Sequence, residues 1–316
     1  MQRLDRILAV IDPTVDAQPG ATKAARLAHS AGAALELFAC DFEPVLTGAP
    51  FFDTDALRQM RDAAVAERAG RLERQAAELR RDGLEVTTHV HWDNPLHAGI
   101  LHRIEEWRPD LVVKDTHYHS PLKRTFFSNT DWHLVRTCPV PLLLAKPAAW
   151  PARPRILAAI DPAHQHAKPA ALDGDILDAA QLVARCLDGQ VEVVHAFFPA
   201  ALLAATAGMA GMPLAAGIGT ADLVEAERAR ITAGVHEVAA SRGLKPAVTR
   251  VLQGAVAELL PKYAEQTDAA ILVMGAVSRS RLRELFVGST AERVLDRLPC
   301  DVLVVKPLDF VDRLPF

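Results

Sequence analysis

The sequence predicts an α/β protein made of two tandem doubly wound five-stranded parallel sheets. Three observations support this prediction. The chain of 316 residues repeats itself, and each repeat alternates short apolar runs with longer helical stretches. Most of the runs are apolar throughout, which is typical of parallel strands that are buried on both faces. Right-handed crossovers between such strands give a doubly wound sheet in each repeat.

The duplication is visible in the amino-acid sequence as repeated segments. RILAVIDP at residues 6–13 returns as RILAAIDP at residues 155–162, and KP at 146–147 returns as KP at 306–307. The offset between the repeats grows from 149 to 160, so the second repeat carries 11 additional residues. The expected parts are domain 1 at 1–147, a proline-rich linker at 148–154, domain 2 at 155–308 and a C-terminal tail at 309–316.

Each repeat contains five expected strands with helical stretches between them. The longest helix, at 53–81, has apolar residues near helical spacing, and the stop signal Gly83 follows it. Ligands of doubly wound sheets bind beyond the carboxyl ends of the strands, so the residues after the first and fourth strands are the candidate site. The strands are expected at 6–11, 35–40, 85–90, 111–114 and 142–145, and again at 156–160, 191–196, 247–251, 270–274 and 302–305.

Composition narrows the class of protein. Half of the residues are hydrophobic (50%) and the formal net charge is −4, so we expect neither a disordered chain nor an electrostatic binder of nucleic acid. We find no uninterrupted apolar run long enough for a membrane span. Four cysteines without a CxxC pair indicate neither a zinc ribbon nor a redox dithiol, and Cys40 and Cys300 fit buried free thiols. We expect a cytoplasmic protein.

The fourth strand of repeat 2 leads into a segment with ligand-binding chemistry. The strand ends at Gly275, and a later helix begins after Gly288, Ser289 and Thr290. Glycine lets the backbone turn tightly and approach a ligand, and hydroxyls at a helix start can cap it and bind an anion. The same residue types also serve an ordinary strand–loop–helix junction, so both readings stay open.

The spacing of these residues resembles a known signature. Gly275, position 278 and Gly288-Ser289 follow the pattern G-x2-G-x9-G-[S/T] of the universal stress protein family, and the flanks ILVMG and AERVL match as well. Both repeats share the resemblance, and TDWHL at 130–134 and the Asp-Pro after each first strand look like the tandem E-type subgroup. It implies the Rossmann-like, adenine nucleotide alpha hydrolase-like fold of the family, with the two sheets in a pseudo-twofold arrangement.

The resemblance also implies an adenine-nucleotide site in repeat 2, with ATP as its candidate cofactor. Asp12 and Asp161 match the family's adenine-side aspartate. The implied binding residues are Asp161, Ala196, Gly275, Ser278, Gly288, Ser289 and Thr290.

Two departures from the signature limit this expectation. Ser278 replaces the second glycine, which weakens a phosphate cradle where a positive φ or a close backbone approach is needed. In repeat 1, Asp115, Tyr118 and Ser128 stand where the three signature glycine positions lie, and Asp115 would place negative charge beside phosphates. Repeat 1 is therefore expected not to bind ATP.

Two other features allow alternative readings. The histidine pairs His89/His91 and His117/His119 have the spacing of metal ligands, but solvated histidines are the simpler expectation and no metal is assigned. The segments at 42–52 and 197–219 follow the second strands and are unusually apolar. They either form a lid packed on its own domain or a partner, or cover an apolar ligand cavity.

No catalytic motif is visible, so we do not expect an enzyme. The leading interpretation is a stress-response protein that binds a small ligand, either ATP or an apolar molecule, in domain 2. One alternative is a nucleotide switch or slow ATPase that uses domain 2, and another is a scaffold with vestigial sites. The partners considered are a small molecule and a second copy of the chain in a homodimer.

Overall fold

The computed structural model describes residues 3–13, 15, 17–41, 55–116, 127–162, 171–200, 220–276 and 289–307. The chain divides into two compact units, Met1–Ala152 (unit 1) and Arg153–Phe316 (unit 2). Each unit contains one of the two sequence repeats.

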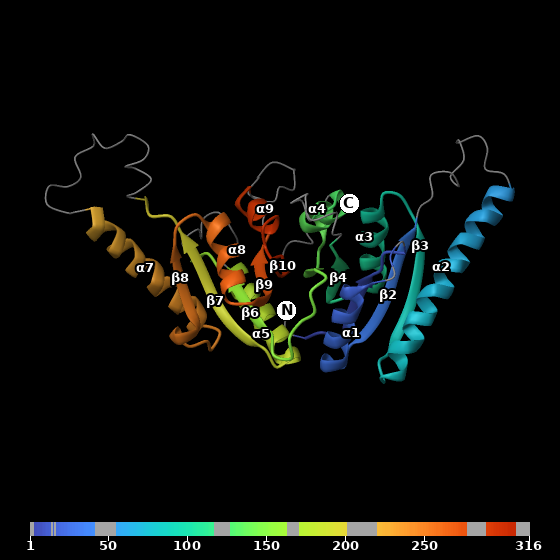
Figure 1. Ribbon diagram of the computed structural model, residues 1–316, viewed down its shortest axis with the longest axis horizontal. Helices are drawn as coiled ribbons and strands as arrows, with labels where there is room; N and C mark the ends of the chain where they lie inside the picture. Colours follow the sequence, from blue (N-terminus) through green and yellow to red (C-terminus); the bar gives the residue numbers. More distant parts are fainter. Residues whose placement is uncertain are drawn as a thin grey trace. The chain divides into compact units, whose positions relative to one another are not determined.

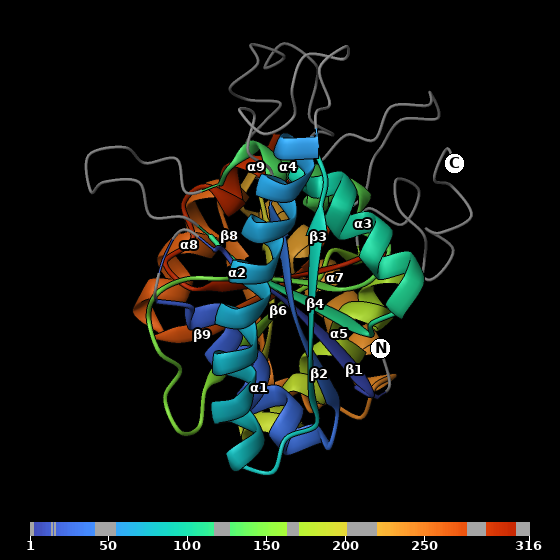
Figure 2. The ribbon, with the colours of Figure 1, turned by 90° about the vertical axis from the view of Figure 1, so that its right-hand side faces the viewer.

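Unit 1 is a parallel sheet with helices on both faces. Its elements are β1 (Arg6–Val10), α1 (Pro19–Ala31), β2 (Ala34–Asp41), α2 (Asp55–Arg81), β3 (Val86–Trp92), α3 (Leu96–Trp107), β4 (Leu111–Asp115), α4 (Asn129–Thr137) and β5 (Leu142–Ala145). The strand order is β3-β2-β1-β4-β5, with every neighbouring pair parallel. Helices α1 and α2 cover one face and α3 and α4 the other (Figures 1 and 2). Right-handed crossovers produce this division, because the chain runs outward from β1 to β3 and then returns to β4 and β5.

Unit 2 repeats this architecture. Its elements are β6 (Arg155–Ala159), α5 (Leu172–Leu187), β7 (Gln190–Phe197), α7 (Thr220–Ala240), the 3-10 helix η3 (Pro246–Val248), β8 (Thr249–Gln253), α8 (Val256–Gln266), β9 (Ala269–Gly275), α9 (Ser289–Leu295) and β10 (Asp301–Val305). The strand order is β8-β7-β6-β9-β10, and all pairs are again parallel. The doubly wound α/β fold expected for each repeat is therefore confirmed.

The expected strands agree with the observed ones to within two residues at each end. The largest shift is at β8, which begins at Thr249 rather than at 247 because the preceding residues form η3. Helix α2 is described from Asp55 and ends at Arg81 as expected, and the expected start at 53 lies outside the described residues. Of its apolar stripe, Leu72 and Ala76 are buried, whereas Met60 is 56% exposed.

The core of each unit includes strands that are buried along their whole length. Strands β4, β5 and β10 are buried at every residue. Complete burial confirms the interpretation that these apolar runs are strands covered on both faces. Cys40 and Cys300 are buried free thiols, as expected.

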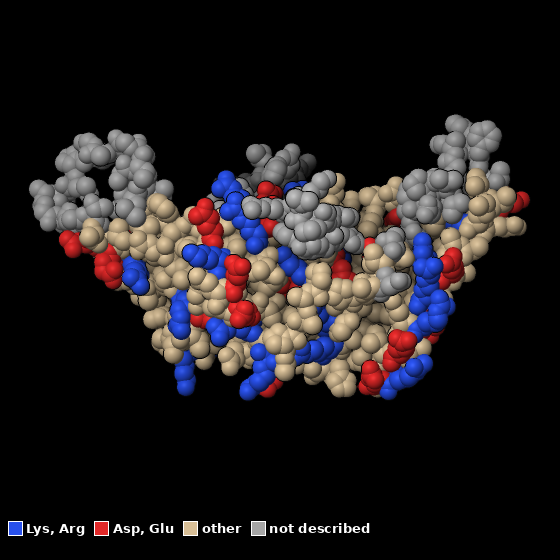
Figure 3. All heavy atoms as spheres, viewed as in Figure 1, with Lys and Arg blue, Asp and Glu red and all other residues tan. Residues whose placement is uncertain are grey.

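Surface charge is mixed in both units. On the face that Figure 3 presents, basic and acidic side chains are interspersed over each unit. Of the helices that the structure describes, none is both long and apolar enough to cross a membrane.

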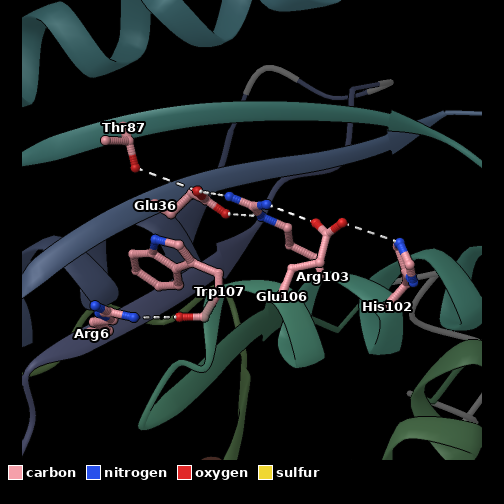
Figure 4. Close-up of polar contacts among 7 residues, drawn as sticks. All are labelled: Arg6, Glu36, Thr87, His102, Arg103, Glu106 and Trp107. Atoms are coloured by element: carbon pink, nitrogen blue, oxygen red, sulfur yellow. Dashed lines mark hydrogen bonds and ion pairs between the residues drawn. The ribbon is translucent and has the colours of Figure 1, made fainter.

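A buried ion pair ties α3 to the sheet in unit 1 (Figure 4). Glu36 on β2 is 2% exposed, and Arg103 on α3 donates to its two oxygens at 2.7 and 2.6 Å. The third contact of the guanidinium is to Glu106 at 2.9 Å, and Thr87 lies 3.5 Å from Glu36. The hydrogen bond to Glu36 raises the pKa of Arg103, so this side chain stays cationic. A bidentate pair fixes orientation as well as distance, so it sets the position of α3 on β2.

A row of rings lies beside this ion pair. The ring centroids are 5.9 Å apart for Phe38 and His89, 6.2 Å for His89 and His91, and 5.6 Å for His91 and His102. Burial lowers the pKa of His89, and Arg103 and His91 lower it further, while Glu36 and Glu106 oppose the shift. The row is therefore packed with the neutral form of His89.

Replacing Arg103 tests the buried pair. We expect Arg103→Met to lower the free energy of unfolding of unit 1 by about 3–5 kcal/mol, because it leaves the Glu36 carboxylate buried without its partner. The control Glu106→Gln removes only the exposed carboxylate of the same network and should have a much smaller effect. Urea unfolding followed by circular dichroism measures both. Equal losses in the two variants would contradict the role given to Glu36.

The pKa of His89 predicts a pH dependence. Its value in the folded protein lies below the ordinary 6.5, so the unfolded chain takes up the proton first as the pH falls. The folded state should therefore lose stability from about pH 6.5 downward, through the lowered pKa of His89. In His89→Gln this part of the loss should disappear, while the exposed His29→Gln should behave as the unchanged protein. Urea midpoints at several pH values measure it, and identical slopes for all three proteins would refute the prediction.

Candidate functional site

The candidate site in unit 2 lies where β6 and β9 end. Asp161 follows β6 and its side chain is 40% exposed, so it is accessible at the carboxyl edge of the sheet. Its backbone N–H donates to Oδ1 of Asp173, at the start of α5, at 3.0 Å. This bond ties the turn after β6 to the first turn of α5 and thereby fixes where the Asp161 carboxylate stands.

A buried histidine supports Asp161 from the neighbouring strand. His195 on β7 is 3% exposed, and its Nδ1 lies 2.9 Å from the carbonyl oxygen of Ile160 and 3.8 Å from Oδ1 of Asp161. A carbonyl oxygen only accepts, so Nδ1 is protonated and donates to Ile160. The ring also stacks on Phe197, with centroids 6.3 Å apart. His195 is thus a positioning residue for the end of β6.

Sequence reasoning did not find His195. It is one of two polar residues, with Glu192, in the largely apolar run VEVVHAFF, and it belongs to no motif. Its only signal is its place near the carboxyl end of the second strand of the repeat, beside the strand that ends before Asp161.

Gly275 at the end of β9 has a packing role. A Cβ built on it would lie 2.7 Å from Cδ2 of Leu172, the first residue of α5, and 3.3 Å from Cδ1 of Ile176. A side chain at position 275 would therefore push α5 away from the strand. Packing against Leu172 therefore gives one explanation for glycine at position 275. The ligand-binding role that the resemblance implies is a second explanation.

The described part of this edge is acidic. The first turn of α5 contributes two buried carboxylates, Asp173 and Asp175, in addition to Asp161. Two basic side chains lie close to these carboxylates: Lys306 follows β10 and is also buried, and the guanidinium of Arg242 lies against Gly174 in the first turn of α5 and pairs with Asp178. Carboxylates are favourable near a helix N-terminus, but they repel phosphate groups at the same place.

The edge of unit 1 is arranged differently. Oδ1 of Asp115, at the end of β4, accepts from the N–H of Gly20 in the first turn of α1 at 2.7 Å. The side chain is 8% exposed, and a Cβ on Gly20 would lie 2.9 Å from the same oxygen. Asp115 thus occupies the helix N-terminus as an anionic ligand would. This explains in structural terms how an acidic residue is accommodated where repeat 2 has Gly275.

The start of α4 in unit 1 is also held by side chains of its own unit. Ser128 and Asp131 form a capping box, with Asp131 N–H donating to Ser128 Oγ at 3.2 Å and Ser128 N–H to Asp131 at 2.7 Å. The other oxygen of Asp131 lies 2.7 Å from Nζ of Lys114, and both side chains are buried. The helix terminus that would face a phosphate is therefore capped and paired internally in unit 1.

The remaining predicted residues divide into two groups. Ala196 lies on β7 between His195 and Phe197, and Ser289 and Thr290 begin α9. Ser278 and Gly288 lie outside the described residues. So do His117 and His119, as well as the apolar segments at 42–52 and 201–219.

The histidine pair on β3 lies on one face of the strand and takes part in the ring row. His97 of α3 and His133 of α4 form a second stack, with centroids 4.1 Å apart, and burial together with His133 lowers the pKa of His97. In the part of the chain that the structure describes, no three His, Cys, Asp or Glu side chains converge as metal ligands.

Comparison with known proteins agrees with this architecture. A model of the universal stress protein family matches residues 3–146 and 153–306, one match in each unit. Universal stress protein E of Salmonella typhi is 28% identical over 316 residues, which cover 98% of this chain and 96% of the relative. Universal stress protein E of Escherichia coli is 28% identical over 313 residues, covering 97% and 95%.

A solved structure shows the same fold. The crystal structure of a functionally unknown protein from Pseudomonas aeruginosa PAO1 matches with a TM-score of 0.72 and 26% identity, covering 98% of this chain and 95% of the other. The match to the family model extends over nearly all of both units, and the parallel sheets fit it. The chain therefore belongs to the universal stress protein family.

Proposed function

We propose that this universal stress protein is a non-enzymatic stress-response protein whose unit 2 binds a small adenine-containing ligand at the carboxyl edge of its sheet. The observation that carries the proposal is the difference between the two edges. The Asp161 carboxylate is accessible and held in place by α5 and β7, whereas in unit 1 the strand end that corresponds to Gly275 carries Asp115, whose carboxylate accepts from Gly20 at the start of α1.

The chemistry of Asp161 suits the base of the ligand. A fixed carboxylate is an acceptor for the exocyclic amino group of adenine, and an acceptor that is already oriented loses little entropy on binding. The resemblance assigns this role to an aspartate after the first strand, and Asp161 stands there. His195 and Asp173 support it by fixing the backbone on which it is carried.

We propose that the phosphate groups of a nucleotide contribute little to the free energy of binding in unit 2. The described edge contains Asp161, Asp173 and Asp175 against Lys306 and an Arg242 that already pairs with Asp178, and Ser278 replaces a signature glycine. Like charges at this distance from a triphosphate cost binding free energy. Adenosine and AMP are therefore proposed to bind about as well as ATP.

Two other functions compete with this proposal. A nucleotide switch or slow ATPase would turn over ATP in unit 2, and a scaffold would bind no nucleotide. An apolar ligand is favoured by one observation, the 42% exposed Phe198 beside Phe197 at the end of β7. Mass spectrometry of material that co-purifies with the protein distinguishes an apolar ligand from a nucleotide.

Free thiols at Cys40, Cys138, Cys186 and Cys300 support a proposed cytoplasmic location.

The role of Asp161 has a matched control in the other unit. We expect Asp161→Asn to weaken adenosine, AMP and ATP about tenfold each, because the lost bond is made by a charged acceptor. Asp12→Asn, at the corresponding position of unit 1, should leave binding unchanged. Isothermal titration calorimetry of the full chain measures both, with circular dichroism as the check on folding. Equal weakening by the two variants would contradict the assignment to unit 2, and no binding of any of the three ligands would favour the scaffold.

Ser278→Gly separates the phosphate contribution from that of the base. If the serine is what weakens the cradle, the variant should bind ATP several-fold more tightly while adenosine affinity stays the same. Calorimetry with both ligands decides this, and an equal gain for adenosine would argue against a phosphate-specific effect.

An ATP-turnover assay on the same proteins should give no rate above the spontaneous one. Turnover that Asp161→Asn abolishes would establish the ATPase alternative instead.

A further inference from the structure

Unit 1 contains a cavity that lies away from the carboxyl edge. It has a volume of about 600 Å³ and lies between α1 and α2, on one face of the sheet. Cavities of roughly 300–1,000 Å³ are the size that holds small-molecule ligands. Because α2 buries only Leu72 and Ala76 along its length, the two helices do not close on each other along this groove.

The floor of the cavity is apolar. Leu37 of β2 and Ala25 of α1 line it, as do Leu79 of α2 and Leu84 just beyond this helix. Leu37 is fully buried and Ala25 is 7% exposed. Such a floor favours the hydrocarbon or aromatic body of a ligand, since burying apolar surface there removes it from water.

The α2 side of the cavity presents acceptors and no cation. The residues of α2 and its C-terminal end that line the cavity are Gln75, Glu78, Leu79 and Asp82, which share one helical face. Oε1 of Gln75 is buried and has no hydrogen-bond partner. Within the described part of the chain, Glu78 and Asp82 take part in no ion pair. A buried acceptor without a donor costs free energy, and a ligand that supplies the donor recovers it.

The α1 side adds little positive charge. Arg26 lines the cavity, but its guanidinium donates to the carbonyl oxygens of Trp150, Pro151 and Ala152 at 3.3, 3.0 and 2.7 Å. His29, in the last turn of α1, is the other basic side chain of the lining. The cavity also reaches the C-terminal ends of α1 and α2, where the helix dipoles are negative and favour a cation.

We propose that this cavity is a binding site for a small amphiphilic amine, that is, an ammonium group on an apolar body. The body lies on the floor formed by Leu37, Ala25, Leu79 and Leu84. The ammonium group lies near the exposed carboxylates of Glu78 and Asp82, and a rotation of the Gln75 side chain brings its buried Oε1 within reach of this donor. The site is separate from the adenine site proposed for unit 2, so either proposal stands if the other fails.

Two probes with the same ring and the same chain length test the charge preference. Tryptamine carries an ammonium group where indole-3-propionate carries a carboxylate. By isothermal titration calorimetry on the full chain, we expect tryptamine to bind one site and indole-3-propionate to bind at least about tenfold more weakly, the ratio expected for two charged contacts. Equal affinities for the two probes would overturn the proposal.

Variants then place the site. Glu78→Gln with Asp82→Asn should weaken tryptamine about tenfold, whereas Glu105→Gln, an exposed glutamate of α3 on the other face of the sheet, should not. Gln75→Leu should also weaken tryptamine while leaving the urea midpoint of unit 1 unchanged or higher, because leucine has no unpartnered acceptor. Tryptamine affinity that is the same in all these variants would show that it binds elsewhere and would overturn the assignment.

Discussion

At the carboxyl edge of each sheet, the first helix of the unit packs against the end of the fourth strand through a glycine, and a Cβ on that glycine would lie 2.7 Å (unit 2) or 2.9 Å (unit 1) from the side chain that faces it. In unit 2 the strand supplies Gly275 and the helix supplies Leu172; in unit 1 the helix supplies Gly20 and the strand supplies Asp115. Either solution lets the helix lie against the sheet at full packing density. The choice determines what remains at the edge, because Leu172 is apolar and buried whereas Asp115 brings a carboxylate to the helix N-terminus.

This constraint explains why the carboxyl edges of the two units of one duplicated chain differ in chemistry. Once Asp115 accepts from Gly20, the helix N–H that could hold an anion is satisfied internally, and a phosphate would meet a carboxylate. The buried pair of Lys114 with Asp131 and the capping box of α4 satisfy the second helix start in the same way. Unit 1 therefore keeps the fold of a nucleotide-binding domain while using its polar edge groups for its own stability.

The fold was predictable because its signals are local and repeated. Ten apolar runs at corresponding places define the strands, and the structure moves their ends by no more than two residues. The position of Asp161 was predictable for the same reason, since it follows a strand. The residues that support this edge were not predictable from the sequence, because they come from other elements and only the folded sheet brings them to the ends of β6 and β9. They are His195, Asp173 and Leu172. The cavity between α1 and α2 also had no sequence signal, because its floor and its acceptors are ordinary residues of β2, of the two helices and of the turn after α2.

The two proposed sites share one electrostatic property: carboxylates and other acceptors outnumber cations in both. A protein with a net charge of −4 and acidic groups at the described edge of unit 2 is a poor host for a triphosphate unless cations are placed with care, and the described edge has one lysine, Lys306. The same surplus of acceptors favours ligand groups that donate, such as the amino group and hydroxyls of a nucleoside or the ammonium group of an amine. In the cavity of unit 1, Arg26 is directed to backbone carbonyl oxygens instead of neutralising Glu78 and Asp82. After the duplication, unit 2 presents an accessible aspartate at its sheet edge, and unit 1 presents acceptors between α1 and α2. In both units the position of the carboxylates explains the proposed preference for ligands that donate hydrogen bonds.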